Sequence, residues 1–272
     1  MCEFCEKHGH GSRWFLNPDN FSDELMRDRG RRKLVEQICG YNIDYYVDFT
    51  SKITGLTHIP VLGSLVRGIT ERLAPGMHGG QVVSLEDALD IASLAKNLVL
   101  IPCACRRLVA HGDDMACLNF GPIRDMQRAA LPDGPMEELT TEEAREVLKL
   151  YDRKGRIHQV LYAKLPFPVV LCNCSTQWCT SFKQRMANGV RGAVMKGHDV
   201  CQVDRQLCDG CGGEAPCVER CAFGALSYDR EGEMVRLDPG KCFGCGLCRD
   251  FCEPQALAMI PRAGIPEIAR SW

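Results

Sequence analysis

"CDGCGGEAPCVERC" at residues 208–221 and "CFGCGLCRDFC" at residues 242–252 are two versions of one cysteine-rich stretch. The flanking residues repeat as well, because "VDRQLCDGCG" (203–212) matches "LDPGKCFGCG" (237–246). The first version contains an insertion, since it has "CGGEAPC" where the second has "CGLC". Residues 203–259 are therefore an internal duplication in which cysteines are concentrated.

The cysteine spacing in this duplication is typical of iron–sulfur ligands. The second version has the spacing C-x2-C-x2-C-x3-C, in which three cysteines bind one 4Fe–4S cluster and the fourth binds a neighbouring cluster. The first version has the related spacing C-x2-C-x5-C-x3-C. Zinc sites usually use two separated pairs of ligands, so eight cysteines in this doubled order favour iron.

Residues 203–259 accordingly resemble the two-cluster 4Fe–4S ferredoxin domain. The resemblance implies two sets of four ligands, in which the fourth member comes from the other version: Cys208, Cys211, Cys217 and Cys252 for one cluster, and Cys242, Cys245, Cys248 and Cys221 for the other. The sequence departs from the family pattern after each fourth cysteine, where proline is usual and Ala222 and Glu253 stand here.

Six more cysteines lie upstream in two groups of similar layout. Helices are expected over residues 84–97 and 140–155, because each range opens with a capping sequence (Ser84 with Asp87, and Thr140 with Glu143). An apolar, strand-like run follows each helix and ends in a C-x-C pair, after which a single cysteine follows. The six residues are Cys103, Cys105, Cys117, Cys172, Cys174 and Cys179.

These six thiols predict at least one further metal centre. Residues two apart in an extended chain project to the same side, so two strand ends placed together would present four thiols to one point. Four thiols bind one 4Fe–4S cluster and leave two to spare. Together with Cys2 and Cys5, the six would instead make eight thiols, enough for two clusters. The sequence leaves both alternatives open.

The N-terminal stretch "CEFCEKHGH" (2–10) indicates a second kind of metal site, with Cys2, Cys5 and His8 as candidate ligands. Zinc binds both sulfur and imidazole nitrogen, and an iron–sulfur cluster shared with the middle thiols is the alternative. Closing four ligands within nine residues would be tight. We therefore expect a remote ligand, such as Cys39 or a spare thiol of the middle segment.

Other short stretches resemble a group of poorly characterised 4Fe–4S-binding proteins of anaerobic microbes. They are "MCEFC" (1–5), "IPCACRR" (101–107), "ACLNFG" (116–121) and "LCNC" (171–174), in this order and upstream of the duplication. The resemblance spans most of the chain. It implies an iron–sulfur redox protein without indicating a particular reaction.

The composition sets limits on compartment and partners. Of 272 residues, 45% are hydrophobic and 18 are cysteine, while 33 basic and 35 acidic side chains give a formal charge of −2. This balance gives no reason to expect nucleic acid as a partner. No apolar run is long enough to span a membrane, and no signal peptide is visible. Clustered cysteines without an export signal indicate metal ligands in a reducing cytoplasm.

The expected fold class is α+β with three parts. They are a helical N-terminal region over residues 1–80, a small α/β middle domain with two C-x-C strand ends over 81–200, and a bacterial-type dicluster ferredoxin fold over 201–263. Within the first part, helices are expected over 21–38 and 59–74. The apolar stripe of the second helix is expected to pack in the core, with a groove for a partner as the alternative.

Together, these features favour an iron–sulfur electron-transfer protein or subunit that docks on a redox partner protein or a larger oxidoreductase complex. One alternative is a reductase whose middle metal site is the reaction centre, with Arg106 and Arg107 orienting an anion. A second alternative is a redox sensor whose thiols or cluster respond to oxygen. Complete cysteine ligation of the middle centre would favour electron transfer, and an open iron would favour catalysis.

Overall fold

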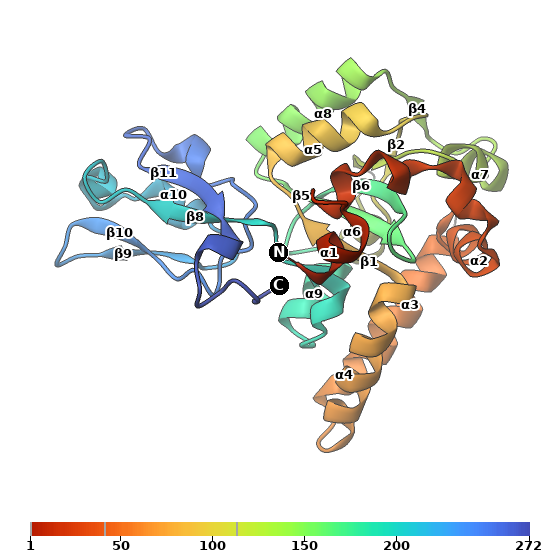
Figure 1. The fold of residues 1–272 in the computed structure, drawn as a ribbon, viewed down its shortest axis with the longest axis horizontal. Coiled ribbons are helices and arrows are strands. Elements are labelled where there is room, and N and C mark those ends of the chain that lie inside the picture. Colours follow the sequence, from red (N-terminus) through yellow and green to blue (C-terminus); the bar gives the residue numbers. More distant parts are fainter. Residues whose placement is uncertain (1, 41, 113) are drawn as a thin grey trace.

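The computed structural model describes residues 2–40, 42–112 and 114–272, and its centre is a sheet with the strand order β4-β2-β3-β6-β5-β1-β7 (Figure 1). Neighbouring strands are antiparallel except β1 and β7, which are parallel. The strands are β1 (His78–Val82), β2 (Val99–Pro102), β3 (Met115–Asn119), β4 (Glu137–Glu138), β5 (Ile157–Ala163), β6 (Pro168–Cys174) and β7 (Val194–Met195).

The two faces of this sheet bury different sets of side chains. Along β6, Leu171 packs on the face covered by α5 (Leu85–Leu94) and α8 (Thr141–Arg153). Val170, Cys172 and Cys174 alternate with it and belong to the core of the opposite face. This period of two places both cysteines of the second C-x-C pair on one face. That opposite face is covered by α2 (Arg29–Ile38), α3 (Asn42–Gly55) and α9 (Thr180–Met186).

The two helices expected from capping sequences are confirmed. In α5, the Ser84 side chain accepts a hydrogen bond from the Asp87 backbone N–H. In α8, Thr140 and Glu143 form a complete capping box, in which each side chain accepts from the other residue's backbone N–H. Gly155, just beyond α8, has a φ of 73°, a conformation that glycine adopts without steric cost.

The expected duplication of the middle segment is only partly right. The strand-like region over residues 156–171 folds into two antiparallel strands, β5 and β6, and the second C-x-C pair lies at the end of β6. The first pair lies at a strand-to-helix turn instead. Cys103 caps α6 (Ala104–Ala110), so Cys105 is helical. The alanines and arginines after Cys103 are good helix formers, which explains why the strand ends at Pro102.

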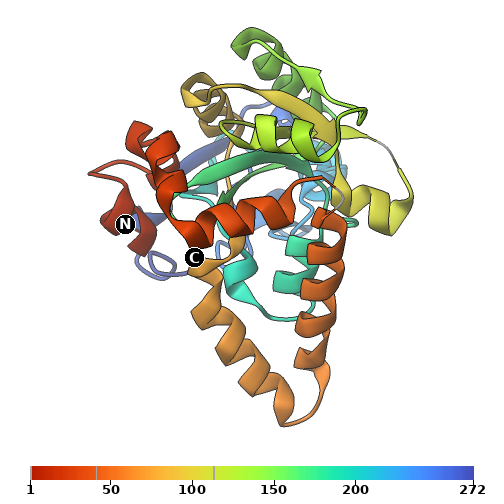
Figure 2. The same cartoon turned by 90° about the vertical axis from the view of Figure 1, so that its right-hand side faces the viewer.

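The N-terminal region contains a helical hairpin that protrudes from the body of the molecule (Figures 1 and 2). It consists of α3, which the sequence did not predict, and α4 (Leu62–Leu73), which lies within the expected range 59–74. The expected core packing of α4 is wrong, because Val61, Leu65 and Leu73 are 93%, 59% and 54% exposed. The stripe exists, but the described residues do not cover it.

The remaining N-terminal residues pack against the sheet. Helix α1 (Glu3–His8) is followed by short 3-10 turns at Trp14–Leu16, Pro18–Phe21 and Asp23–Arg27. Trp14 and Phe15 are fully buried in the core beneath α5 and α8. The expected helix over 21–38 is formed by the last of these turns and α2. The proposed boundaries near residues 80 and 200 stay predictions.

The cysteine-rich C-terminal segment forms two antiparallel strand pairs to one side of the main sheet (Figure 1). They are β8 (Asp199–Val203) with β11 (Leu257–Pro261), and β9 (Leu226–Asp229) with β10 (Met234–Leu237). Helix α10 (Pro216–Arg220) and the 3-10 turn at Arg249–Phe251 precede the fourth cysteine of each version. One further helix, α7 (Ile123–Ala130), follows β3 along the chain.

Candidate metal centres

The six middle thiols meet in one closed ring on the face of the sheet opposite α5 and α8. Cys117 and Cys172 are directly opposite in the β3–β6 register, with their sulfur atoms 3.8 Å apart. Each remaining thiol interacts with the two that flank it. The order around the ring is Cys103, Cys105, Cys179, Cys174, Cys172 and Cys117. The structure therefore brings together all six cysteines that the sequence grouped.

The pKa values alternate around this thiol ring. Hydrogen bonds from the flanking thiols are the largest cause of a lowered pKa, which is about 6 for Cys117 and about 5 for Cys174. The thiols with lowered pKa values are Cys105, Cys117 and Cys174. Those with raised pKa values, again chiefly from hydrogen bonds between thiols, are Cys103, Cys172 and Cys179. The shared hydrogen bonds therefore favour the thiolate form, which binds metals, at Cys105, Cys117 and Cys174.

Neighbouring polar groups hold the sulfur atoms in place. The Gln159 side-chain amide donates to Cys174 Sγ at 2.6 Å and to Cys179 Sγ at 3.2 Å. Thr180 Oγ1 lies 3.0 Å from Cys105 Sγ. Such contacts orient thiolate ligands and tune the metal that they bind. This donor set suits iron–sulfur clusters and other thiophilic metals.

The eight cysteines of the C-terminal duplication fall into two groups. One group lines a small cavity and consists of Cys221, Cys242, Cys245 and Cys248. The other four, Cys208, Cys211, Cys217 and Cys252, interact electrostatically with one another, and Cys217 also interacts with Cys248 of the first group. In both versions, the backbone N–H four residues later donates to the fourth cysteine, at 3.2 Å from Ala225 to Cys221 and from Ala256 to Cys252. The two expected ligand sets stay predictions.

Three phenylalanines connect the thiol ring with the Cys221-containing group. Phe223 and Phe243 stack with ring centroids 4.1 Å apart. Phe182 contacts them edge-on at 5.5 and 6.2 Å. Phe182 lies on α9, just after the ring member Cys179, while Phe223 closely follows Cys221. The three phenylalanines and Cys245 therefore belong to the same core as the ring thiols.

A further group of possible ligands lies on the other side of the sheet. The sulfur atoms of Cys2 and Cys5 are 3.0 Å apart, and His198 Nε2 lies 3.7 and 3.2 Å from them. The Trp14 backbone N–H donates to Cys5 Sγ at 3.3 Å. The hydrogen bond between the two thiols is the main cause of opposite shifts, because it lowers the pKa of Cys2 to about 5 and raises the pKa of Cys5. Two sulfurs and an imidazole form a donor set that suits zinc.

This geometry corrects the expected N-terminal site. Among the described residues, the potential metal-binding group contains Cys2, Cys5 and His198 and does not include His8. Both cysteines of α1 face the interior, while His8 is half-buried at the end of that helix. Cys39, the suggested remote ligand, belongs to the core of the opposite face. Because Cys2 and Cys5 lie apart from the thiol ring, the eight-thiol arrangement for two clusters is also wrong.

The sequence did not indicate two residues that lie in these groups, His198 beside Cys5 and Cys201 beside Cys248. His198 stands more than 190 positions from Cys5, and no spacing rule links them. Cys201 was unassigned, yet its sulfur lies 3.7 Å from Cys248 Sγ. The position of Cys201 just before the duplication was the available signal.

The arginines suggested for anion binding are already paired. Arg106 forms an ion pair with Asp114, and its guanidinium stacks 4.5 Å from the Trp178 ring. Arg107 forms an ion pair with Asp44. Both guanidiniums therefore have protein partners, which argues against their role in orienting an anion.

Comparisons with known proteins identify a ferredoxin-like iron–sulfur segment in this chain. The chain is 37% identical over 70 residues to the polyferredoxin protein MvhB of Methanothermobacter marburgensis, which covers 22% of this chain and 17% of the relative. It is 37% identical over 57 residues to an uncharacterized ferredoxin-like protein, YdhX, of Escherichia coli K12, covering 21% and 25%. It is 33% identical over 54 residues to one component of the Na(+)-translocating ferredoxin:NAD(+) oxidoreductase complex of Acetobacterium woodii, covering 20% and 16%.

These likenesses are limited to part of each chain. The matched region spans a quarter or less of the length of each of these curated relatives. No family model and no solved structure matches the chain. The described helices include none that is both long and apolar enough to cross a bilayer.

Proposed function

We propose that this chain is an iron–sulfur electron-transfer protein in which a two-cluster ferredoxin-like segment is connected to a further metal centre on the thiol ring. The observation that carries the proposal is the convergence of six thiols from β3, β6 and the N-terminal ends of α6 and α9. Apolar packing gives no reason for such a ring, because buried cysteines without a metal behave as scattered small hydrophobic residues.

The ligand roles follow from the three groups of thiols. The two groups of the duplication would each hold one 4Fe–4S cluster, and four of the six ring thiols would hold a third. Such clusters accept and donate single electrons at potentials set by charge, hydrogen bonds and exposure. The residues of this chain contribute the thiolates, the N–H donors to sulfur and the packed phenylalanines that hold the Cys221-containing group beside the ring.

The Cys2, Cys5 and His198 site has a different role in this proposal. We assign zinc to it, with a structural function, because its ligands join the first residues of the chain to the segment just before β8. Binding one metal there restrains the junction between the main sheet and the ferredoxin-like segment.

One relative is by name a component of a redox assembly, the Na(+)-translocating ferredoxin:NAD(+) oxidoreductase complex of Acetobacterium woodii. By analogy, a redox protein or a larger oxidoreductase complex would be the partner of this chain, in the reducing cytoplasm that its free cysteines favour.

A reductase is the second candidate function, and a specific observation favours it. The thiol ring is not sealed in the core but borders a cavity of about 400 Å³. A simple electron carrier has no need for a cavity of this size beside a metal centre, whereas pockets of this size hold small molecules.

Metal analysis tests the proposal. Protein purified without oxygen should contain about 12 irons per chain, from three four-iron clusters, and the Cys172→Ser/Cys174→Ser variant should contain about 8. The matched control is Cys39→Ser, which changes a buried cysteine outside all three groups and should retain about 12. About 8 irons in the unaltered protein would refute the third iron centre.

A further inference from the structure

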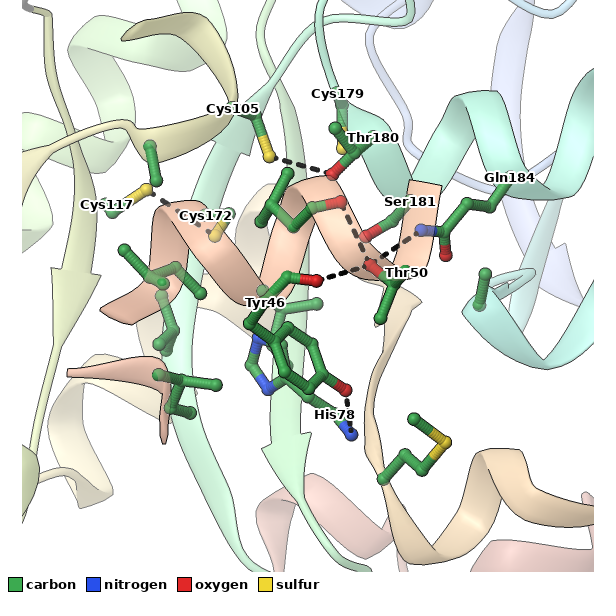
Figure 3. A pocket seen from close by; sticks show the side chains of 18 of the residues that line it. Tyr46, Thr50, His78, Cys105, Cys117, Cys172, Cys179, Thr180, Ser181 and Gln184 are labelled. Carbon is green, nitrogen blue, oxygen red and sulfur yellow. Dashed lines mark hydrogen bonds between the residues drawn. The ribbon is translucent and has the colours of Figure 1, made fainter. Parts of the chain in front are cut away.

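The cavity beside the thiol ring lies between the sheet and the inner side of the α3–α4 hairpin. Figure 3 shows Cys105, Cys117, Cys172 and Cys179 along one side of it and Tyr46 and His78 across from them. We propose that this cavity binds a neutral, predominantly apolar organic molecule that carries a hydrogen-bond donor. The inference rests on the proposed function only in that the molecule would lie beside the metal centre of the ring.

The walls of the cavity are mainly apolar. From the hairpin, Phe49, Ile53, Ile69 and Leu73 line it, and from the sheet Leu161 and Val170 do. Burial against such walls favours apolar ligands roughly in proportion to the apolar area removed from water. Because the hairpin forms one wall, a ligand would be enclosed between two parts of the chain rather than held on an open surface.

The charges around the cavity disfavour an anion. Among the described lining residues, Arg107 is the one whose side chain is permanently charged, and it pairs with Asp44. His78 Nδ1 donates to the Tyr162 carbonyl at 2.9 Å, since a carbonyl can only accept. Burial lowers the pKa of His78 and so favours its neutral form. An anion entering this cavity would lose its hydration without a free cation to compensate.

Two buried hydrogen-bond acceptors in the cavity wall favour a ligand that carries a hydrogen-bond donor. The Asn119 and Gln159 side-chain oxygens are buried and lack a hydrogen-bond partner among the described residues, and both residues line the cavity. The residues are 4% and 1% exposed. Asn119 follows Cys117 by two positions on β3, so it lies on the face of the thiol ring. Buried acceptors are normally satisfied, and a ligand O–H or N–H beside Asn119 would satisfy this one.

Three probes with the same ring system test this inference on the anaerobically purified full chain. They are 2-naphthol, which is neutral and has a donor, 2-methoxynaphthalene, which is neutral and has none, and naphthalene-2-sulfonate, which is an anion. Calorimetry should show 2-naphthol binding about 5- to 10-fold more tightly than the methoxy compound, the value of one hydrogen bond. The sulfonate should bind about 100-fold more weakly than 2-naphthol.

Variants then locate the binding in the cavity. Asn119→Leu should abolish the preference for 2-naphthol over 2-methoxynaphthalene. Ile69→Trp, at a half-exposed wall position that tolerates a larger side chain, should weaken both neutral probes. The control Leu65→Ser changes an exposed residue of the same helix outside the cavity and should leave all affinities unchanged.

Each result has a definite meaning. Tight binding of the sulfonate, or an unchanged preference in Asn119→Leu, would overturn the inference. If Asn119→Leu does not fold, unchanged affinities in Ile69→Trp would overturn it. The iron content of the same samples is measured separately, so an absent third metal centre and an absent binding site give different results.

Discussion

Replacing His198 by glutamine should remove the metal from the N-terminal site. The site consists of two sulfurs and one imidazole nitrogen that lie within 4.8 Å of one another. Glutamine keeps a polar side chain of similar reach but loses the imidazole ligand. Loss of a group that only orients a ligand costs about 10- to 100-fold in metal affinity, so loss of a direct ligand should cost at least about 100-fold, or about 2.7 kcal/mol.

This loss of affinity should appear in stability. At saturating zinc, weaker binding lowers the free energy of unfolding by the same amount. For a chain of this size, 1 kcal/mol corresponds to about 2–4 °C, so the melting temperature of His198→Gln should fall by about 5–10 °C. Zinc per chain, measured after gel filtration, should fall by about one.

The matched control is His8→Gln, which changes the histidine that the N-terminal motif alone would select. The His8→Gln variant should keep its zinc, and its melting temperature should be unchanged. Because the His198 ring also packs 5.6 Å from Phe15 and 5.0 Å from Trp272, both variants should be compared again after chelation, which isolates the packing contribution. Retention of zinc in His198→Gln, or its loss in His8→Gln, would refute the assignment.

Two further changes test other parts of the structure. Burial raises the pKa of Asp87 to about 6 despite its ion pair with Arg13. The folded state therefore binds a proton more tightly than the unfolded state, and the free energy of unfolding should decrease as pH rises from about 4 to about 6. In urea titrations, Asp87→Asn should remove up to about 3 kcal/mol of this decrease, and identical pH profiles for the two proteins would contradict this reasoning. Trp178→Ala removes two cation–π contacts, with Arg106 and Arg156, and should lower the free energy of unfolding by about 1–2 kcal/mol. Because Trp178 lines a small cavity against the thiol ring, the variant should also lose its visible absorbance faster in air, and an unchanged rate would exclude a shielding role.

Local sequence patterns predicted the parts of the site that depend on local geometry. The pairing of Cys172 with Cys174 on one face follows from strand alternation, and the structure has it. The capping sequences at Ser84 and Thr140 located two helices because a cap acts within one turn. The spacing of the duplication predicts two ligand sets, and Cys221, Cys242, Cys245 and Cys248 of one set line the same small cavity.

What the sequence did not predict depends on contacts between distant parts of the chain. The Cys117–Cys172 pair exists because β3 lies beside β6, and no local pattern specifies this strand order. Cys2 and Cys5 lie beside His198 rather than His8 because of the way in which α1 packs on the rest of the chain. The exposed stripe of α4 has the same periodicity as a buried one, so its pattern alone could not show that it would remain uncovered.

The link between Cys5 and His198 also has a consequence for biosynthesis. The two residues are separated by 193 positions, which at about 5–20 residues per second corresponds to roughly 10–40 s of translation. Throughout that interval the emerging cysteine pair lacks His198, so any ion that the pair holds is bound without this ligand. The complete site can form only after the ribosome has passed the start of β8. A metal ion bound by all three ligands would therefore occur only on nascent chains in which both edge strands of the main sheet, β4 and β7, have already been synthesised.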